Sequence, residues 1–212
     1  VAEHADLGVA HDGDADRCLA VDENGIVIDG DRIIAVLAKR MKEKGILKGD
    51  SAVVTVMSNL GFHDFMKQNG MKTVCAKVGD RYVLEEMLKN GYNIGGEQSG
   101  HIIMLDHATT GDGQLTAAML IKVMQDTGKK LSELCRDIVD YPQLLVNVKI
   151  TESGKGKWST VPAITESISA AERELAGNGR VLVRESGTEP LVRVMVEGKD
   201  MEMVKRLADN IA

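Results

Sequence analysis

Three aspartates alternate with small residues in the segment HDGDADR, at Asp12, Asp14 and Asp16. Carboxylates crowded into so short a segment repel one another unless a cation gathers them. Hard oxygen ligands favour Mg²⁺ or Ca²⁺ over softer metals. The spacing therefore indicates a divalent cation site, and a solvated acidic turn stands beside it as the open alternative.

An EF-hand is a second way to use these aspartates, because Glu23 stands at the twelfth position counted from Asp12. That loop requires glycine at its sixth position, where this chain has Arg17. The flanking runs LGVA and CLAVD are apolar and strand-like rather than helical, so we exclude an EF-hand. Arg17 beside three carboxylates instead indicates a site that also meets a phosphate, since a guanidinium binds phosphate bidentately.

The segment RESGTEP, residues 184–190, has the composition of an anion-binding loop. Gly187 lets backbone N–H groups turn inward, and Ser186 and Thr188 offer hydroxyl donors. Arg184 and Arg193 add charge-assisted hydrogen bonds. An ordinary hairpin loop is the alternative for this segment.

The apolar pattern predicts the elements that must hold these loops. Up to residue 139, short apolar strands alternate with helices, which predicts an α/β domain whose mainly parallel sheet is covered by helices and binds ligands at the carboxyl ends of its strands. Asp31 is expected to cap the first helix and Ser58 the second. Beyond Pro142, the pattern predicts a smaller α+β domain. We expect three parts: 1–29, the end of a preceding α/β domain with the metal loop; 30–143, the α/β domain; and 144–212, the α+β domain.

Composition excludes several classes of function. The net charge of -6 would repel nucleic acid and anionic membrane surfaces, and no apolar run reaches the roughly 18 residues of a membrane span. Cys18, Cys75 and Cys135 suit neither a disulfide framework nor zinc-ligand spacing, so we expect a reducing cytoplasm. Because the chain opens at Val1 on a strand-like run, we expect a fragment of a longer protein.

A third loop, GGEQSGH at residues 95–101, completes an order of motifs that resembles the α-D-phosphohexomutase family. The resemblance covers nearly the whole chain. Four further segments resemble its phosphoglucosamine mutase branch most closely: VMSNLGF, AKVGDRYV, TTGDG and PQLLVNV.

The resemblance implies an isomerase that interconverts glucosamine 6-phosphate and glucosamine 1-phosphate through a phosphoserine and a bisphosphorylated intermediate, feeding UDP-N-acetylglucosamine and cell-wall precursor synthesis. It implies Mg²⁺ at Asp12, Asp14 and Asp16, together with a phosphoserine oxygen. It implies sugar contacts from Glu97 and Ser99. The residues it implies for catalysis are Lys77, His101 and Arg17, and those for the phosphate that is not transferred are Arg184, Ser186, Gly187, Thr188 and Arg193.

The implied partners are the phosphorylated hexosamine and the missing N-terminal domains, and a homodimer is left open. The chain has no serine placed as phosphoryl carrier, so we expect the fragment alone to be inactive. Gln98 is typical of the glucosamine branch. Two residues depart from the family pattern: Ala15 replaces a glycine in the metal loop, and Glu185 replaces a proline beside the phosphate loop.

Two alternatives stay open at this point. A phosphomannomutase or phosphoglucomutase would share the mechanism and differ in its sugar. A non-catalytic module that binds a cation and a phosphate would share the loops without turnover.

Overall fold

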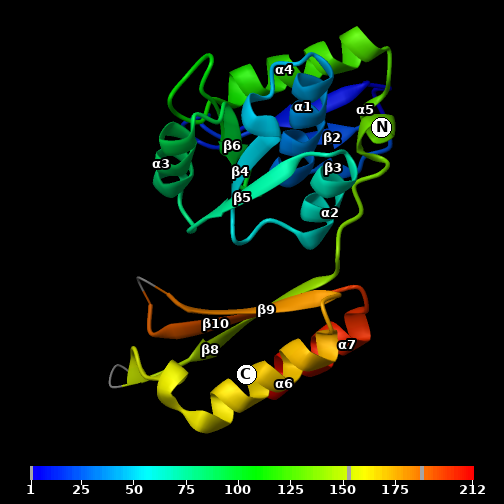
Figure 1. The fold of residues 1–212 in the computed structure, drawn as a ribbon. Helices are drawn as coiled ribbons and strands as arrows, with labels where there is room; N and C mark the ends of the chain where they lie inside the picture. The colour runs from blue at the N-terminus through cyan, green and yellow to red at the C-terminus, as the bar shows by residue number, and fades with distance from the viewer. Residues whose placement is uncertain (1, 152–153, 187–188) are drawn as a thin grey trace. The chain divides into compact units, whose positions relative to one another are not determined.

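The computed structural model describes residues 2–151, 154–186 and 189–212. The chain divides into two compact units, Val1–Val139 and Asp140–Ala212 (Figure 1). The three-part division expected from the sequence, with 1–29 belonging to a preceding domain, stays a prediction.

The main sheet of the first unit has four strands in the order β5-β4-β6-β7. β4 runs parallel to both β5 and β6, and only β7 is antiparallel to its neighbour. All of β4 is buried, as expected for a central parallel strand covered on both faces. The expected mainly parallel sheet is confirmed. Its strands are β4 (Ser51–Thr55), β5 (Lys72–Ala76), β6 (Ile94–Gly96) and β7 (Ile102–Met104).

Helices cover both faces of this sheet. On one face α1, α2, α4 and α5 share a core that includes Ile34, Phe62 and Leu120, whereas α3 packs its buried Val83 and Met87 against the other. This burial of apolar side chains is the main stabilising contribution to the unit. The helices are α1 (Gly30–Glu43), α2 (Leu60–Gln68), α3 (Asp80–Asn90), α4 (Gly113–Thr127) and α5 (Leu131–Cys135).

A second, antiparallel sheet of the first unit has the order β1-β2-β3. Its strands are β1 (Leu7–Ala10), β2 (Leu19–Asp22) and β3 (Val27–Ile28). The metal loop, residues 11–18, therefore joins two strands, which agrees with the exclusion of an EF-hand. β1 lies at the edge of the sheet, and Gly8, Val9 and Ala10 are exposed along it.

The second unit is a three-stranded antiparallel sheet in the order β8-β10-β9, with α6 and α7 side by side along one face (Figure 1). Val146, Val183 and Val194 face these helices and belong to one core. The expected α+β architecture is confirmed. The elements are β8 (Gln143–Lys149), α6 (Pro162–Leu175), β9 (Gly179–Glu185), β10 (Leu191–Gly198) and α7 (Met201–Ile211).

Both predicted helix caps are wrong by a residue or two. α1 is capped by Asp29, whose carboxylate accepts a hydrogen bond from Arg32 N, while buried Asp31 accepts one from Asn59 N at 2.8 Å. α2 is capped by Asn59 rather than Ser58. α1 can begin at Gly30 only because a glycine fits there: a Cβ would lie 2.0 Å from the carbonyl oxygen of Glu97.

α5 is shorter than expected and ends at Cys135, because Ile138 N turns back to Cys135 O. Short 3₁₀ turns occur at Lys48–Asp50 and Trp158–Thr160. In the described part of the chain, no helix has both the length and the apolarity to cross a membrane.

An ion-pair cluster joins α1 to α4 at the surface. Asp126 lies 2.6 Å from Lys44 Nζ, 3.2 Å from Lys122 Nζ and 3.6 Å from Arg40 Nη2. Hydrogen bonds from Lys44 and Lys122 lower the pKa of Asp126 to about 2. A depressed carboxyl pKa stabilises the fold at pH values above the ordinary pKa.

We expect Asp126→Asn to lower the Tm modestly at pH 7, because solvent screens this cluster. The contribution of the carboxylate is fully present above 3.8 and is lost as the pH falls toward about 2, so the Tm difference from the parent should narrow over that window. Thermal melts across this range, with Asp137→Asn as the matched control, test this. A difference that stays constant with pH would contradict it.

The metal loop contains a strained residue, since Ala15 has φ 59. The left-handed region costs an L-residue roughly 1–2 kcal/mol, and glycine adopts it freely. The conformation that the family's glycine would supply is therefore present here, but it is held by alanine.

We expect Ala15→Gly to stabilise the chain by up to about 1 kcal/mol, because relief of strain exceeds the added entropy of the unfolded chain. Urea unfolding measures the change. Ala118→Gly, the same substitution on the exposed face of α4, should instead destabilise by about 1 kcal/mol. If Ala15→Gly and Ala118→Gly lowered the free energy of unfolding by similar amounts, Ala15 would not be strained.

Candidate active site

The metal loop brings its three aspartates together. One carboxylate oxygen from each of Asp12, Asp14 and Asp16 lies within 4.8 Å of the others. Asp12 and Asp14 are exposed, whereas Asp16 is partly buried. Oxygen donors at this spacing from a single loop suit a hard divalent cation. The three predicted ligands are thus neighbours in the fold.

Arg17 occupies this cluster rather than pointing away from it. Its Nε lies 3.2 Å from Asp12 Oδ2 and 3.7 Å from Asp16 Oδ1. Desolvation raises the pKa of Asp12, but the hydrogen bond from Arg17 N and the charge of Arg17 outweigh it and leave that pKa below its usual value. Desolvation, followed by repulsion from Asp12 and Asp14, raises the pKa of Asp16. The loop therefore carries more negative charge than Arg17 offsets.

His101 lies against the metal loop, as its predicted role requires. Its Nε2 is 3.6 Å from Asp16 Oδ2 and 3.9 Å from Asp80 Oδ2, and only 4% of the residue is exposed. Its Nδ1 is buried and has no hydrogen-bond partner among the described residues. Asp80, the first residue of α3, is a neighbour that the sequence analysis did not single out. Its place after the parallel strand β5 could have indicated it.

The loop at residues 97–101 is hydrogen-bonded to the segments on either side of β2 and β3. Gly100 O accepts from Cys18 N at 3.0 Å, and Gln98 O accepts from Gly30 N at 2.9 Å. Gly100 has φ +95, and a Cβ there would lie 2.4 Å from Cys18 O, so only glycine fits. The metal loop and the predicted sugar loop thus form one connected structure.

Glu97 and Gln98 have different surroundings. Glu97 Oε1 accepts from Gly79 N at 3.1 Å, which orients its carboxylate toward the segment that carries Lys77. Gln98 Nε2 donates to Asp29 Oδ2 at 3.2 Å, so this amide supports the cap of α1. Ser99, the residue after Gln98, is exposed.

Lys77 is exposed, and its Nζ lies 5.7 Å from the centre of the Tyr82 ring. The structure gives it no direct contact with His101. Gly79 and Asp80, just after it, contact Glu97 and His101, so this segment borders the site.

In the second unit, Arg184 and Arg193 stand directly opposite each other on β9 and β10. Like charges in this register repel unless an anion lies between them. Arg193 Nε is buried without a hydrogen-bond partner among the described residues, and its Nη2 is 3.7 Å from Glu189. An anion near the two arginines would relieve this repulsion and could accept from Arg193 Nε.

The rest of the predicted phosphate loop is only partly described. Ser186 N donates to Leu191 O, and Ser186 Oγ accepts from Glu189 N. Gly187 and Thr188 lie outside the described residues. Glu185 alternates to the other face of β9 and accepts a hydrogen bond from Gly156 N at 2.6 Å, so its charge does not face the arginine pair.

Two residues of β8 extend this face and were missed in the sequence. Asn147 is opposite Arg193, Lys149 is opposite Leu191, and both are exposed. The alternation of valine with polar residues in LLVNVKI was the available signal, because successive strand residues face opposite sides.

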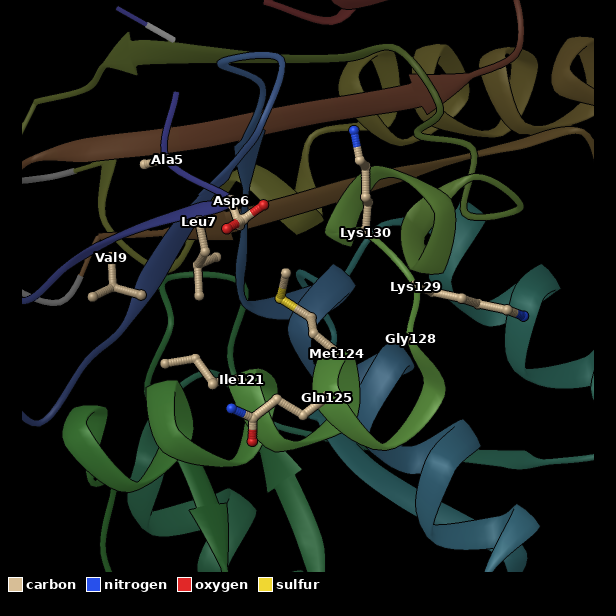
Figure 2. A pocket seen from close by; sticks show the side chains of 10 residues that line it. All are labelled: Ala5, Asp6, Leu7, Val9, Ile121, Met124, Gln125, Gly128, Lys129 and Lys130. Atoms are coloured by element: carbon tan, nitrogen blue, oxygen red, sulfur yellow. The ribbon is translucent and has the colours of Figure 1, made fainter. Parts of the chain in front are cut away.

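An apolar cavity of about 650 Å³ in the first unit is lined by none of the residues of these loops. Leu7, Ile121 and Met124 point into it, between β1 and α4 (Figure 2).

Comparison with known proteins agrees with this arrangement. The family model for phosphoglucomutase/phosphomannomutase alpha/beta/alpha domain III matches residues 29–141, and that for the C-terminal domain matches residues 145–212. The chain is 56% identical over 211 residues to a phosphoglucosamine mutase of Lacticaseibacillus casei, and 55% identical over 213 residues to one of Caldanaerobacter subterraneus. These alignments cover 100% of the chain but 46% and 48% of the relatives. The chain thus spans about half their length.

Among solved structures, Aspergillus fumigatus N-acetylphosphoglucosamine mutase in complex with GlcNAc-6P and magnesium has the same fold. The TM-score is 0.78 at 21% identity, covering 96% of this chain and 50% of that one. The fold, the matching family models and the relatives lead to one conclusion. The chain belongs to the phosphoglucomutase/phosphomannomutase family.

Proposed function

We propose that this chain is the part of a phosphoglucosamine mutase that binds the metal, the sugar and the distal phosphate. The complete protein would interconvert glucosamine 6-phosphate and glucosamine 1-phosphate. One observation carries the proposal: backbone hydrogen bonds join the metal loop to the loop at 97–101. Asp16, His101 and Glu97 therefore belong to one connected group of loops. The curated relatives with more than half of their aligned residues identical support the choice of sugar.

Mg²⁺ fits the metal loop, because all three donors are carboxylates and the net charge of the loop is negative. Asp12, Asp14 and Asp16 would hold the ion, and a phosphoserine oxygen would complete the set. When bound, Mg²⁺ supplies positive charge that offsets the negative charge of a phosphoryl group in transfer.

Glu97 and Ser99 would bind sugar hydroxyls. A carboxylate accepts hydrogen bonds and a serine hydroxyl both donates and accepts, which suits a pair of adjacent hydroxyls. The bond from Gly79 N leaves the other oxygen of Glu97 for the sugar while it fixes the orientation of the carboxylate. This preorganisation lowers the entropy cost of binding.

His101 and Lys77 are the acid–base candidates, with Arg17 as an electrostatic helper. Buried His101 is oriented by Asp16 and Asp80, so it can hold a proton at Nε2 beside the metal loop. Lys77 is exposed and would act only if substrate binding draws its Nζ away from Tyr82.

Arg184, Arg193 and Ser186 would bind the phosphate that is not transferred, together with Gly187 and Thr188. The unpartnered Nε of Arg193 supports this role, because a buried donor without a partner is costly until a ligand accepts from it. Asn147 and Lys149 on the same face would add an amide donor and a further positive charge.

The complete protein would also need a phosphoserine donor, and we propose that the remaining half of the polypeptide carries it. The chain alone would then be inactive. Two apolar features of the first unit fit a covering segment: the exposed edge of β1 and the cavity between β1 and α4. We also propose that the complete protein is cytoplasmic, because the three free cysteines would stay reduced there. It would form a homodimer.

The product would enter the synthesis of UDP-N-acetylglucosamine and of cell-wall precursors. Gln98 supports this choice of sugar only indirectly, since its amide bonds Asp29. A preference of the complete protein for glucose 6-phosphate or mannose 6-phosphate over glucosamine 6-phosphate would keep the mechanism and change the substrate. No turnover with any of the three would favour a binding module.

We expect Asp14→Asn in the complete protein to lower kcat by on the order of 100-fold, because a carboxylate ligand is lost. Asp14 accepts no hydrogen bond among the described residues, so the Tm should change little. Steady-state assays with glucosamine 6-phosphate measure kcat, and Asp209→Asn on the exposed face of α7 is the control. Normal turnover in Asp14→Asn would remove the metal loop from the site.

We expect Arg184→Ala to raise KM by about tenfold or more, through the loss of a charge-assisted contact with phosphate. Among the described residues Arg184 pairs with no carboxylate, so stability should be nearly unchanged. Arg173→Ala, an exposed arginine of α6, controls for net charge. A KM equal to that of the parent would exclude Arg184 from phosphate binding.

A further inference from the structure

We propose that Gly111 and Gly113 are positioning residues, which set the shape of the metal loop by packing against its backbone. This inference rests on the proposed metal site and adds a part of the chain about a hundred residues away. We call residues 111–113 the glycine floor. They lie in the segment TTGDG, at the start of α4.

Gly113 contacts the backbone of the metal loop directly. Its N–H donates to Ala15 O at 3.0 Å, at the residue with the strained φ. A Cβ at Gly113 would lie 2.3 Å from Arg17 O and 2.6 Å from His11 Nδ1. His11 Nδ1 in turn lies 2.9 Å from Arg17 O and closes the loop across its base. No larger residue can occupy position 113 unless the metal loop shifts.

Gly111 supports the opposite side of the loop. A Cβ there would lie 2.5 Å from both Cδ2 and Nε2 of His101 and 2.7 Å from Asp16 O. Gly111 therefore borders both Asp16, a proposed metal ligand, and His101. A side chain at position 111 would therefore displace the His101 ring or the Asp16 backbone and change the contact of His101 Nε2 with Asp16 Oδ2, now 3.6 Å.

The glycine floor is itself held rigidly. Asp112 caps α4, with Oδ1 accepting from Leu115 N at 2.9 Å, and its carbonyl accepts from Thr116 Oγ1 at 2.8 Å. Thr116 and Leu120 are fully buried in the first unit. Because these contacts anchor the start of α4 in the core, we expect a Cβ at Gly111 or Gly113 to displace the metal loop rather than α4.

The two residues that Gly111 borders, Asp16 and His101, each carry a buried polar atom. Asp16 Oδ1 and His101 Nδ1 are both buried without a hydrogen-bond partner in the described part of the chain. Atoms of this kind are costly unless a ligand satisfies them. Gly111 lies against the His101 ring and the Asp16 backbone, and a bound cation could satisfy Asp16 Oδ1.

Mg²⁺ titration of the complete protein by calorimetry tests the proposal. Gly113→Ala and Gly111→Ala should each weaken Mg²⁺ binding by about tenfold or more, the range seen when groups behind metal ligands are altered. Glycine-to-alanine exchange at the start of a helix otherwise stabilises it, so a lowered Tm in Gly113→Ala would support the clash. Val123→Ala, a buried change in the same helix, should lower the Tm and leave the Mg²⁺ Kd unchanged.

The outcomes separate this inference from the proposed function. Parent and floor variants with equal Mg²⁺ affinity would overturn the positioning role alone, whereas a parent that binds no Mg²⁺ would overturn both. Amide exchange on the unaltered chain avoids any doubt from misfolding. Exchange at Gly113 N–H should slow when Mg²⁺ is added, because a fixed loop strengthens its bond to Ala15 O, and unchanged exchange would overturn the proposal.

Discussion

Mutual repulsion among three carboxylates is the constraint on which the rest of the site depends. Asp12, Asp14 and Asp16 converge within 4.8 Å on a loop that contains a left-handed alanine. Arg17 offsets part of the charge, while desolvation and then repulsion from Asp12 and Asp14 raise the pKa of Asp16. A loop in this state needs support from the surrounding structure, and it has high affinity for positive charge only if that support holds its shape.

The fold supplies that support through backbone contacts rather than side-chain packing. Gly100 fits against Cys18 and Gly113 fits against Arg17, each at a distance that excludes a Cβ. Helix starts and strand ends meet at these points, so the loops are fixed by elements buried in the core. The second unit differs, because two arginines stand opposite each other across antiparallel strands, and an anion would relieve the repulsion between them. The predicted metal site and the predicted phosphate site thus lie in different units of the chain.

The sequence predicted the order and type of most elements, because their apolar periodicity is strong. It also singled out three aspartates of one loop, which lie near one another in the fold, and their role as metal ligands stays a prediction. It failed where position depends on tertiary contact: Asp29 rather than Asp31 caps α1 because Gly30 fits only against Glu97 O. The contact of residues 111–113 with the metal loop was missed for the same reason, since it forms only when a distant segment is brought beside the loop, whereas Asp80 and Asn147 carried local sequence signals that were overlooked. Gln98, expected from the sequence only as a residue typical of the glucosamine branch, also donates a hydrogen bond to Asp29, the cap of α1.

The central claim is that the three aspartates form one divalent cation site beside His101. Crystals of the chain soaked in Mn²⁺, with diffraction recorded at a wavelength where manganese scatters anomalously, would test it most directly. The account predicts an anomalous peak bounded by carboxylate oxygens of Asp12, Asp14 and Asp16. A fully soaked crystal with no peak there, or with its strongest peak on other side chains, would contradict it.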